Sequence, residues 1–191
     1  MSYYADYIVE IDNALRGLKV TTLQNVEVHP EEGFRLWCDM THRLKEANGT
    51  MFFAGNGASA MMSSHMAVDV CKNAGIRSMG FNDVAFLTAI SNDVAYEKAF
   101  SLPLSRYANP GVILVTISSS GNSPNVIDVI AEARKMGVYV ITLSGMKPDN
   151  RSRLSGDLNF YIPAGTYGFV ESAHQVLLHC WFDMYMEACT K

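Results

Sequence analysis

The stretch VILVTISSSGNSPN, residues 112–125, decides the fold more than any other part of the chain. A continuous apolar run, residues 112–117, ends at three consecutive serines and is followed by a glycine, Asn122 and Ser123. A pattern typical of a helix begins directly afterwards, at Pro124. An apolar run bounded by a polar turn with glycine is typical of a buried strand. The segment therefore predicts a strand, a turn and a helix in succession.

The turn between that strand and that helix has the features of an anion-binding site. Backbone N–H groups at a helix start have no partner within the helix, and the helix dipole favours negative charge there. Hydroxyl donors can be added by Ser118, Ser119, Ser120 and Ser123. Such neutral donors fit a phosphate group. The alternative is that the serines only cap the helix and fill the turn, but one cap requires a single serine.

A second loop of similar design lies upstream. The apolar residues 51–54 are followed by Gly55-Asn56-Gly57-Ala58-Ser59 and then by a helical pattern. The loop lacks the lysine of the Walker pattern and the third glycine of the dinucleotide fingerprint, so no nucleotide cofactor is expected. Ligands of parallel α/β folds gather at the carboxyl ends of the strands. Two such loops therefore favour one shared site.

Helical and strand-like patterns alternate along the rest of the chain. Strands are expected over residues 51–54, 77–80, 112–117, 138–143 and 158–162, and helices over residues 2–18, 30–48, 58–72, 83–91, 96–107, 124–136 and 168–189. This alternation predicts an α/β fold with a parallel sheet that helices cover on both faces. Residues 1–191 are expected to form one domain, with extra N-terminal helices within residues 1–48.

Composition and charge exclude several classes of function. The net charge is −4 and no cluster of Lys and Arg is present, so no nucleic acid partner is expected. No apolar run reaches the roughly 18–20 residues of a membrane span, and the N-terminal stretch is acidic where a signal peptide is basic. The cysteines form no Cys-x-x-Cys pair, which predicts reduced, mostly buried thiols in a cytoplasmic protein; they are Cys38, Cys71, Cys180 and Cys189.

The expected last helix carries large apolar residues on several faces. They are Val176, Leu177, Leu178, Trp181, Phe182, Met184 and Tyr185. A helix that is apolar on more than one side is buried on more than one side. A subunit interface is expected to cover it, with burial inside a larger monomer as the alternative.

Ionisable residues on two of the expected helices could carry chemistry. His65 and Asp69 are four residues apart, which places them on one helix face. Such a pair suits a metal ion or a base with an orienting partner, although a hydrogen-bonded surface pair is the simpler interpretation of the spacing alone. Glu171, His174 and His179 share the last helix, where no spacing is decisive and where His174 is expected to be a satisfied core histidine.

At these residues the sequence resembles the sugar isomerase (SIS) domain family, and within it the phosphoheptose isomerases, over nearly its whole length. The most specific matches are GNGAS at residues 55–59, SND at 91–93 and ISSSGNSPNV at 117–126. The resemblance implies a three-layer α/β/α sandwich with a five-stranded parallel sheet. It also implies a homotetramer with active sites between subunits, N-terminal helices that pack on a neighbouring subunit, and a zinc ion in many members.

The resemblance further implies roles for individual residues. Phosphate binding falls to Ser118, Ser119, Ser120 and Ser123, and other substrate contacts to Asn56, Gly57, Ala58, Ser59, Asn92, Asp93 and Glu171. The metal ligands are His65, Asp69, Glu171 and His179. Asp69 stands where the family has a glutamate that serves as ligand and base, and Glu171 stands where it has a glutamine. The catalytic residues are therefore Asp69, Glu171 and His179, with the base left open between the two carboxylates.

The function that the resemblance implies is an aldose–ketose isomerase acting on a sugar phosphate, with sedoheptulose 7-phosphate as the expected substrate and an enediol intermediate. Isomerisation of another phosphosugar is an alternative, because Ala58 and Asn73 replace the family's usual glycine and arginine. A further alternative is a non-catalytic sugar-phosphate sensor or a protein-binding factor of the replication initiator-associating type. The presence of both histidines and both carboxylates favours an enzyme.

Overall fold

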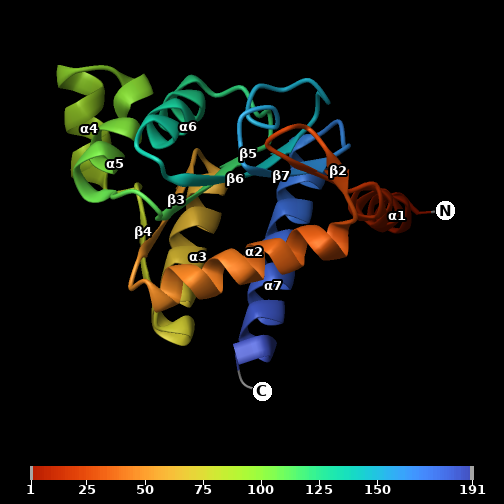
Figure 1. Cartoon of the computed structure of the whole chain (residues 1–191). Helices are drawn as coiled ribbons and strands as arrows, with labels where there is room; N and C mark the ends of the chain where they lie inside the picture. The colour runs from red at the N-terminus through yellow and green to blue at the C-terminus, as the bar shows by residue number, and fades with distance from the viewer. Residues whose placement is uncertain (1, 190–191) are drawn as a thin grey trace.

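The computed structural model describes residues 2–189, in which a seven-stranded sheet lies between two layers of helices (Figure 1). The strands are β1 (Lys19–Thr22), β2 (Glu27–Val28), β3 (Thr50–Gly55), β4 (Arg77–Gly80), β5 (Ile113–Ser118), β6 (Tyr139–Gly145) and β7 (Leu158–Ile162). The helices are α1 (Tyr3–Arg16), α2 (Pro30–Glu46), α3 (Ala58–Ala74), α4 (Val84–Asp93), α5 (Ser101–Tyr107), α6 (Pro124–Lys135) and α7 (Tyr167–Cys189), with the 3-10 turn η1 (Tyr96–Lys98).

The strand order is β2-β1-β7-β6-β5-β3-β4. The five strands from β7 to β4 pair in parallel, which confirms the predicted five-stranded parallel sheet. β1 and β2 extend it as an antiparallel edge that the sequence analysis missed. β1 reads only Lys-Val-Thr-Thr, which is too short and too polar to give a strand pattern.

The two helical layers cover opposite faces of the sheet. On one face α2, α3 and α7 pack against the strands and against each other, and α1 packs on α7; α4, α5 and α6 lie on the other face (Figure 1). All six positions of β5 are buried, as expected of a parallel strand between two helical layers. The three-layer prediction is therefore confirmed. The helix expected over residues 96–107 is instead η1 followed by α5, because Pro103 fits only the first turn of a helix.

The expected last helix is covered mostly by its own chain. The Trp181 ring stacks on Trp37 of α2 at 4.3 Å between centroids, and Trp181, Phe182 and Tyr185 are all buried. The expectation that a neighbouring subunit covers these three residues is therefore wrong. Of the predicted apolar set on this helix, Val176 and Met184 are exposed and the other five residues are not.

The cysteines follow the prediction only in part. Cys38 is buried, but Cys71 and Cys180 are exposed, so the expectation of mostly buried thiols is wrong for these two. The side chain of Cys189 lies outside the described part of the structure. Within residues 2–189, no helix combines the length and the apolarity that a membrane span requires.

Candidate active site

The serine loop, residues 118–123, joins the carboxyl end of β5 to the start of α6. Ser123 is the N-cap residue of α6, yet its side chain makes no capping hydrogen bond. The Ser119 hydroxyl is buried without a hydrogen-bond partner among the described residues. A buried hydroxyl without a partner is costly unless a ligand or water satisfies it. These two serines therefore do more than cap a helix, which favours the phosphate-binding interpretation.

The chain that follows β6 holds the serine loop in place. The carbonyl of Ser119 accepts a hydrogen bond from the backbone N–H of Gly145 at 3.1 Å, and the carbonyl of Gly121 accepts one from Ser152 at 2.8 Å. Gly121 has φ +63°, and a Cβ atom there would lie 2.0 Å from Asn150 Oδ1. Only glycine meets both conditions. The loop is thus fixed before any ligand arrives.

The first substrate loop, residues 55–59, lies beside the serine loop because β3 and β5 are neighbours in the sheet. The Asn56 and Asn125 side-chain amides exchange two hydrogen bonds of 2.9 Å, and Tyr96 donates its hydroxyl to Asn56 Oδ1 at 2.8 Å. The Asn56 oxygen therefore accepts two hydrogen bonds already and ties the two loops together. The sequence predicts no role for Asn125, although this residue lies inside the matched motif. It predicts none for Tyr96 either, because Tyr96 carries no local signal.

A cavity of about 230 Å³ lies between the two loops. The structure brings together every predicted substrate residue except Asn92 and Asp93; the cavity is lined by Asn56, Gly57, Ala58, Ser59, Ile117, Ser118, Ser119, Ser120, Ser123, Tyr167 and Glu171. Tyr167 was missed because a single tyrosine at a helix start has no distinctive pattern.

Asn92 and Asp93 end α4, where the Asn92 amide donates to the Asp93 carboxylate at 2.8 Å. Neither lines the cavity between the loops. Tyr96, three residues beyond Asp93, is the residue from this region that reaches Asn56. The roles of Asn92 and Asp93 in substrate binding therefore stay a prediction.

Three side chains of α3 and α7 that could hold a metal ion lie close together beside the groove between these helices. His65 Nε2 and Asp69 Oδ2 are 3.4 Å apart, and one ligand atom each from His65, Asp69 and His179 all lie within 4.8 Å of one another. Tetrahedral zinc with bonds of about 2.0–2.1 Å separates its ligand atoms by roughly 3.3–3.5 Å. The donor set of two imidazoles and a carboxylate fits zinc. Asn73 donates to Asp69 Oδ1 at 3.5 Å and so helps to orient the carboxylate.

Glu171 lies outside this close cluster but joins the two parts of the site. It lines the cavity between the loops, and it also lines the α3–α7 groove together with His65 and His179. Ala58 is the other residue that lines both. A ligand bound at the serine loop therefore reaches the groove past the Glu171 carboxylate.

His174, three residues after Glu171, has no exposed surface. Burial lowers its pKa to about 4, and the Ser144 backbone opposes that shift only in part. Neither ring nitrogen makes a hydrogen bond of normal geometry to a described residue. The expected core position is confirmed, whereas the expected hydrogen-bond partners are missing.

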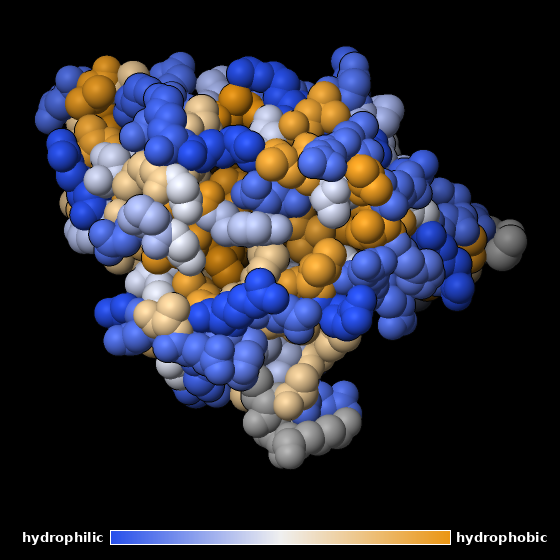
Figure 2. Space-filling view, viewed as in Figure 1, coloured by the Kyte–Doolittle hydropathy of each residue, from blue (hydrophilic) through white to orange (hydrophobic). Residues whose placement is uncertain are grey.

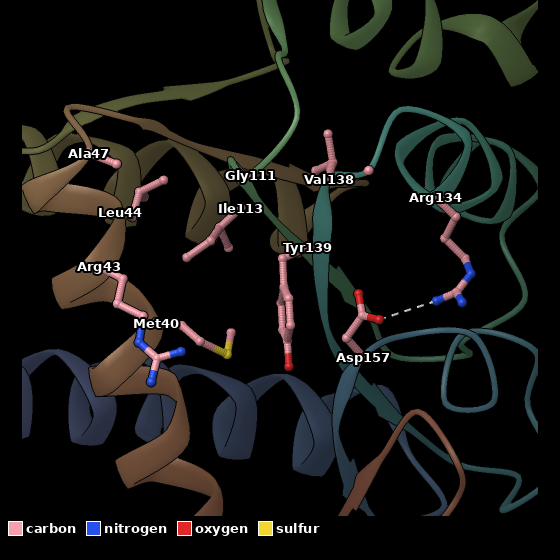
Figure 3. Close-up of a pocket in the computed structure, with 11 residues that line it drawn as sticks. Met40, Arg43, Leu44, Ala47, Gly111, Ile113, Arg134, Val138, Tyr139 and Asp157 are labelled. Atoms are coloured by element: carbon pink, nitrogen blue, oxygen red, sulfur yellow. Dashed lines mark hydrogen bonds and ion pairs between the residues drawn. The ribbon is translucent and has the colours of Figure 1, made fainter.

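A separate cavity of about 490 Å³ lies at the opposite ends of the strands, away from the serine loop. Apolar residues gather in this hollow between α2 and the strands (Figure 2). Figure 3 shows Tyr139 between Arg43 and Arg134, with Arg134 paired to Asp157 at 3.5 Å. Because the cavity lies at the amino ends of β5 and β6 and holds no residue of either loop, it is not the candidate site.

Comparison with known proteins identifies relatives of this chain. The SIS domain family model matches residues 20–145. The phosphoheptose isomerase of Aromatoleum aromaticum is 33% identical over 144 residues, which cover 71% of this chain and 73% of the relative. That of Campylobacter concisus is 33% identical over 150 residues, which cover 75% of this chain and 79% of the relative.

Solved structures extend the similarity to nearly the whole chain. The phosphoheptose isomerase of Neisseria gonorrhoeae has a TM-score of 0.81 and 25% identity, and the match covers 95% of this chain and 97% of that one. The phosphoheptose isomerase of Francisella tularensis has a TM-score of 0.82 at 19% identity, covering 96% and 95%. The second similarity shows the fold alone.

Proposed function

The chain belongs to the SIS domain family, and we propose that it is a phosphosugar isomerase that interconverts sedoheptulose 7-phosphate and an aldoheptose 7-phosphate. The supporting observation is that the serine-loop cavity and the α3–α7 groove share Glu171. In an extended heptose 7-phosphate, bonds of about 1.5 Å place the two reacting carbons roughly 9–10 Å from the phosphorus atom. When the phosphate is bound at the serine loop, the reacting carbons can therefore extend to the carboxylates and histidines of the α3–α7 groove.

Ionisable side chains of this chain carry out the proton transfers of the proposed isomerisation. A carboxylate removes the proton from carbon 1 of the ketose and returns it to carbon 2 of the enediol, while His179 exchanges the proton on oxygen. Asp69 is our first candidate for the base, because it stands at the position of the family's catalytic glutamate. Glu171 is the rival, because it lies between the phosphate and the groove and outside the close cluster.

A bound zinc ion would polarise the substrate oxygen as a Lewis acid. His65, Asp69 and His179 would hold it, with Glu171 as the fourth residue of the predicted set. Asp69 is one methylene shorter than the family's glutamate, and Glu171 adds a negative charge where the family has an amide. The first change shortens one carboxylate without altering the charge of the site, and the second makes the site one charge more negative. The two changes compensate each other only if Glu171 takes over the role of the base.

We also propose a homotetramer. Apolar side chains are exposed on α1 at Tyr3, Tyr4, Ile8 and Val9, and the groove wall is exposed at Met61. Clusters of this kind on a soluble protein mark interaction surfaces. Light scattering should give about four times the chain mass of 21.1 kDa. The free thiols favour the cytoplasm as the compartment.

The test is turnover of the zinc-loaded protein on a panel of ketose phosphates, with free sedoheptulose as the matched control. We expect conversion of sedoheptulose 7-phosphate and at most slow conversion of the free sugar, because the serine loop binds the phosphate. Conversion of a different ketose phosphate would retain the reaction class and correct the sugar. Tight binding of the sugar phosphates without turnover by any of them would instead favour the non-catalytic sensor.

A further inference from the structure

A second cavity adjoins the phosphate cavity across Ser120. It has a volume of about 640 Å³ and is lined by Ser120, Asn122, Met146, Lys147, Tyr161, Pro163, Ala164 and Gly165. Ser120 lines both cavities, so the two spaces lie on either side of one loop residue. Its hydroxyl already accepts a long hydrogen bond of 3.3 Å from the backbone N–H of Asn122, which leaves its own proton free to donate.

The phosphate cavity itself lacks positive charge. None of its lining residues is a lysine or an arginine, and one of them is the carboxylate of Glu171. A phosphate monoester carries a charge of about −1.5 to −2 at neutral pH. Neutral donors alone would therefore hold this charge beside a like charge, which favours a nearby cation.

Lys147 is the cation of the adjoining cavity. Its ammonium group makes no ion pair or hydrogen bond to the residues that the structure describes, and its side chain is exposed. It follows the carboxyl end of β6 by two residues, on the same edge of the sheet as the serine loop. Its four-carbon stem therefore extends from the edge where the substrate binds.

The residue before Lys147, Met146, has an unusual backbone conformation. Met146 has φ +58°, the left-handed region that a side chain other than glycine rarely adopts. The Tyr161 hydroxyl donates to the Met146 carbonyl at 2.7 Å, and the Asn150 amide donates to the Lys147 carbonyl at 2.8 Å. Strained residues that their surroundings hold in place cluster at ligand sites.

The same Asn150 fixes Lys147 relative to the serine loop. Its side chain fills the space beside Gly121, where a Cβ would collide with Asn150 Oδ1 at 2.0 Å. The turn that carries Lys147 and the loop that carries Ser120 are thus packed against each other through one asparagine. The backbone from which the exposed Lys147 side chain extends is therefore held in place relative to the serine loop.

We propose that the cavity on the far side of Ser120 belongs to the phosphate-binding site and that Lys147 supplies its positive charge. This inference rests on the proposed function and adds a residue to it. Lys147 binds the dianion from the side opposite Glu171 and takes no part in proton transfer. It gives the enzyme its preference for phosphorylated over free sugars.

The test measures the affinity for inorganic phosphate by calorimetry and the KM and kcat for sedoheptulose 7-phosphate. Lys147→Gln should weaken phosphate binding and raise KM by about 5- to 20-fold. This is less than the roughly 10- to 150-fold of a hydrogen bond to a charged group, because the side chain of Lys147 is exposed to solvent. Lys147→Arg should stay within about threefold of the wild type, and kcat should not change. Raising the salt concentration should weaken phosphate binding less in Lys147→Gln than in the wild type, because salt screens the lost attraction.

The control is Lys135→Gln, which removes an exposed lysine at the end of α6 that pairs with Glu132. This variant should match the wild type. Unchanged phosphate affinity in Lys147→Gln, with affinity lost in Ser120→Ala/Ser123→Ala, would overturn the role of Lys147 and leave the proposed function intact. Unchanged affinity in all of these variants would refute the phosphate site itself. Equal losses in Lys147→Gln and Lys147→Arg would show that folding of the turn, and not the charge, is responsible.

Discussion

The serine loop and the α3–α7 groove differ in how they are built, although Glu171 lines the space at both of them. The loop is one contiguous segment whose Ser119 and Gly121 carbonyls are hydrogen-bonded to the chain after β6. The groove depends on side chains from two helices, with the His65 side chain 51% exposed and the Asp69 side chain 21% exposed. The loop is preorganised by backbone contacts, whereas the geometry of the groove rests on partly exposed side chains.

This difference suggests a division of labour. Binding energy from the rigid phosphate anchor can position a substrate whose reacting carbons lie elsewhere. The groove then carries the groups that exchange protons. Variants of the groove should change turnover, and variants of the loop should change affinity.

The largest effect is expected in the groove. Asp69→Asn removes the proposed base and should lower kcat by about 10²- to 10⁴-fold, the usual contribution of a positioned base. Glu171→Gln restores the residue that the family has there and should remain active. Steady-state kinetics of the zinc-loaded variants measures both.

The opposite pattern would reverse this assignment. If Glu171→Gln is inactive and Asp69→Asn retains turnover with metal bound, the base is Glu171. Full activity in both variants would contradict the proposal that either carboxylate is the base.

The scaffold beneath both regions should lose stability in acid, because His174 on α7 is buried. Burial lowers its pKa to about 4 from 6.5, so the unfolded chain takes up a proton between these values and the folded chain does not. Stability is therefore complete above about pH 6.5 and falls by about 3 kcal/mol as the pH drops to about 4.

Urea unfolding at pH 7.5 and pH 4.5, with a metal chelator present, measures this loss. His174→Leu should show a smaller loss than the wild type over the same interval. Parallel losses in the two proteins would mean that His174 is not responsible.

Metal binding should depend on the groove alone. His65→Ala should weaken zinc binding by at least the 10- to 100-fold that loss of a supporting residue costs. Elemental analysis and zinc titration provide the measurement, and His42→Ala, which removes an exposed histidine of α2 that faces Glu46, is the matched control. Equal zinc content in both variants would exclude His65 as a ligand.

The loop should show the smallest change in free energy and none in the chemistry. Ser120→Ala/Ser123→Ala should weaken sugar-phosphate binding by about 1–3 kcal/mol in sum, while kcat at saturation stays close to that of the wild type. Calorimetry gives the affinity and circular dichroism checks the fold. Wild-type affinity in a folded double variant would contradict the phosphate assignment.

The same contrast explains what could be predicted from the sequence. The serine loop was predictable because the strand, the turn and the helix N-terminus are adjacent in the chain. The groove required a family resemblance, because the 113 residues between His65 and His179 carry no local signal of their contact. β1 and Tyr96 were missed for a related reason, since both acquire their roles only through distant partners, Phe160 and Asn56.

The coverage of α7 shows a further limit. The sequence correctly indicated that Trp181 is buried, but not that Trp37 of the same chain covers it. The pattern of apolar residues on a helix indicates which of its faces are buried, but not which other part of the protein covers them.

The most direct test of the central claim is isomerisation of sedoheptulose 7-phosphate in D₂O by the zinc-loaded protein, followed by NMR. A carboxylate that carries the proton through an enediol loses part of it to solvent in each turnover, so deuterium should accumulate at carbon 2 of the aldose or at carbon 1 of the ketose as the reaction cycles, and Asp69→Asn should abolish both. Full equilibration of the two sugars without any deuterium uptake would contradict proton transfer through an enediol, and the absence of both conversion and exchange would contradict the isomerase.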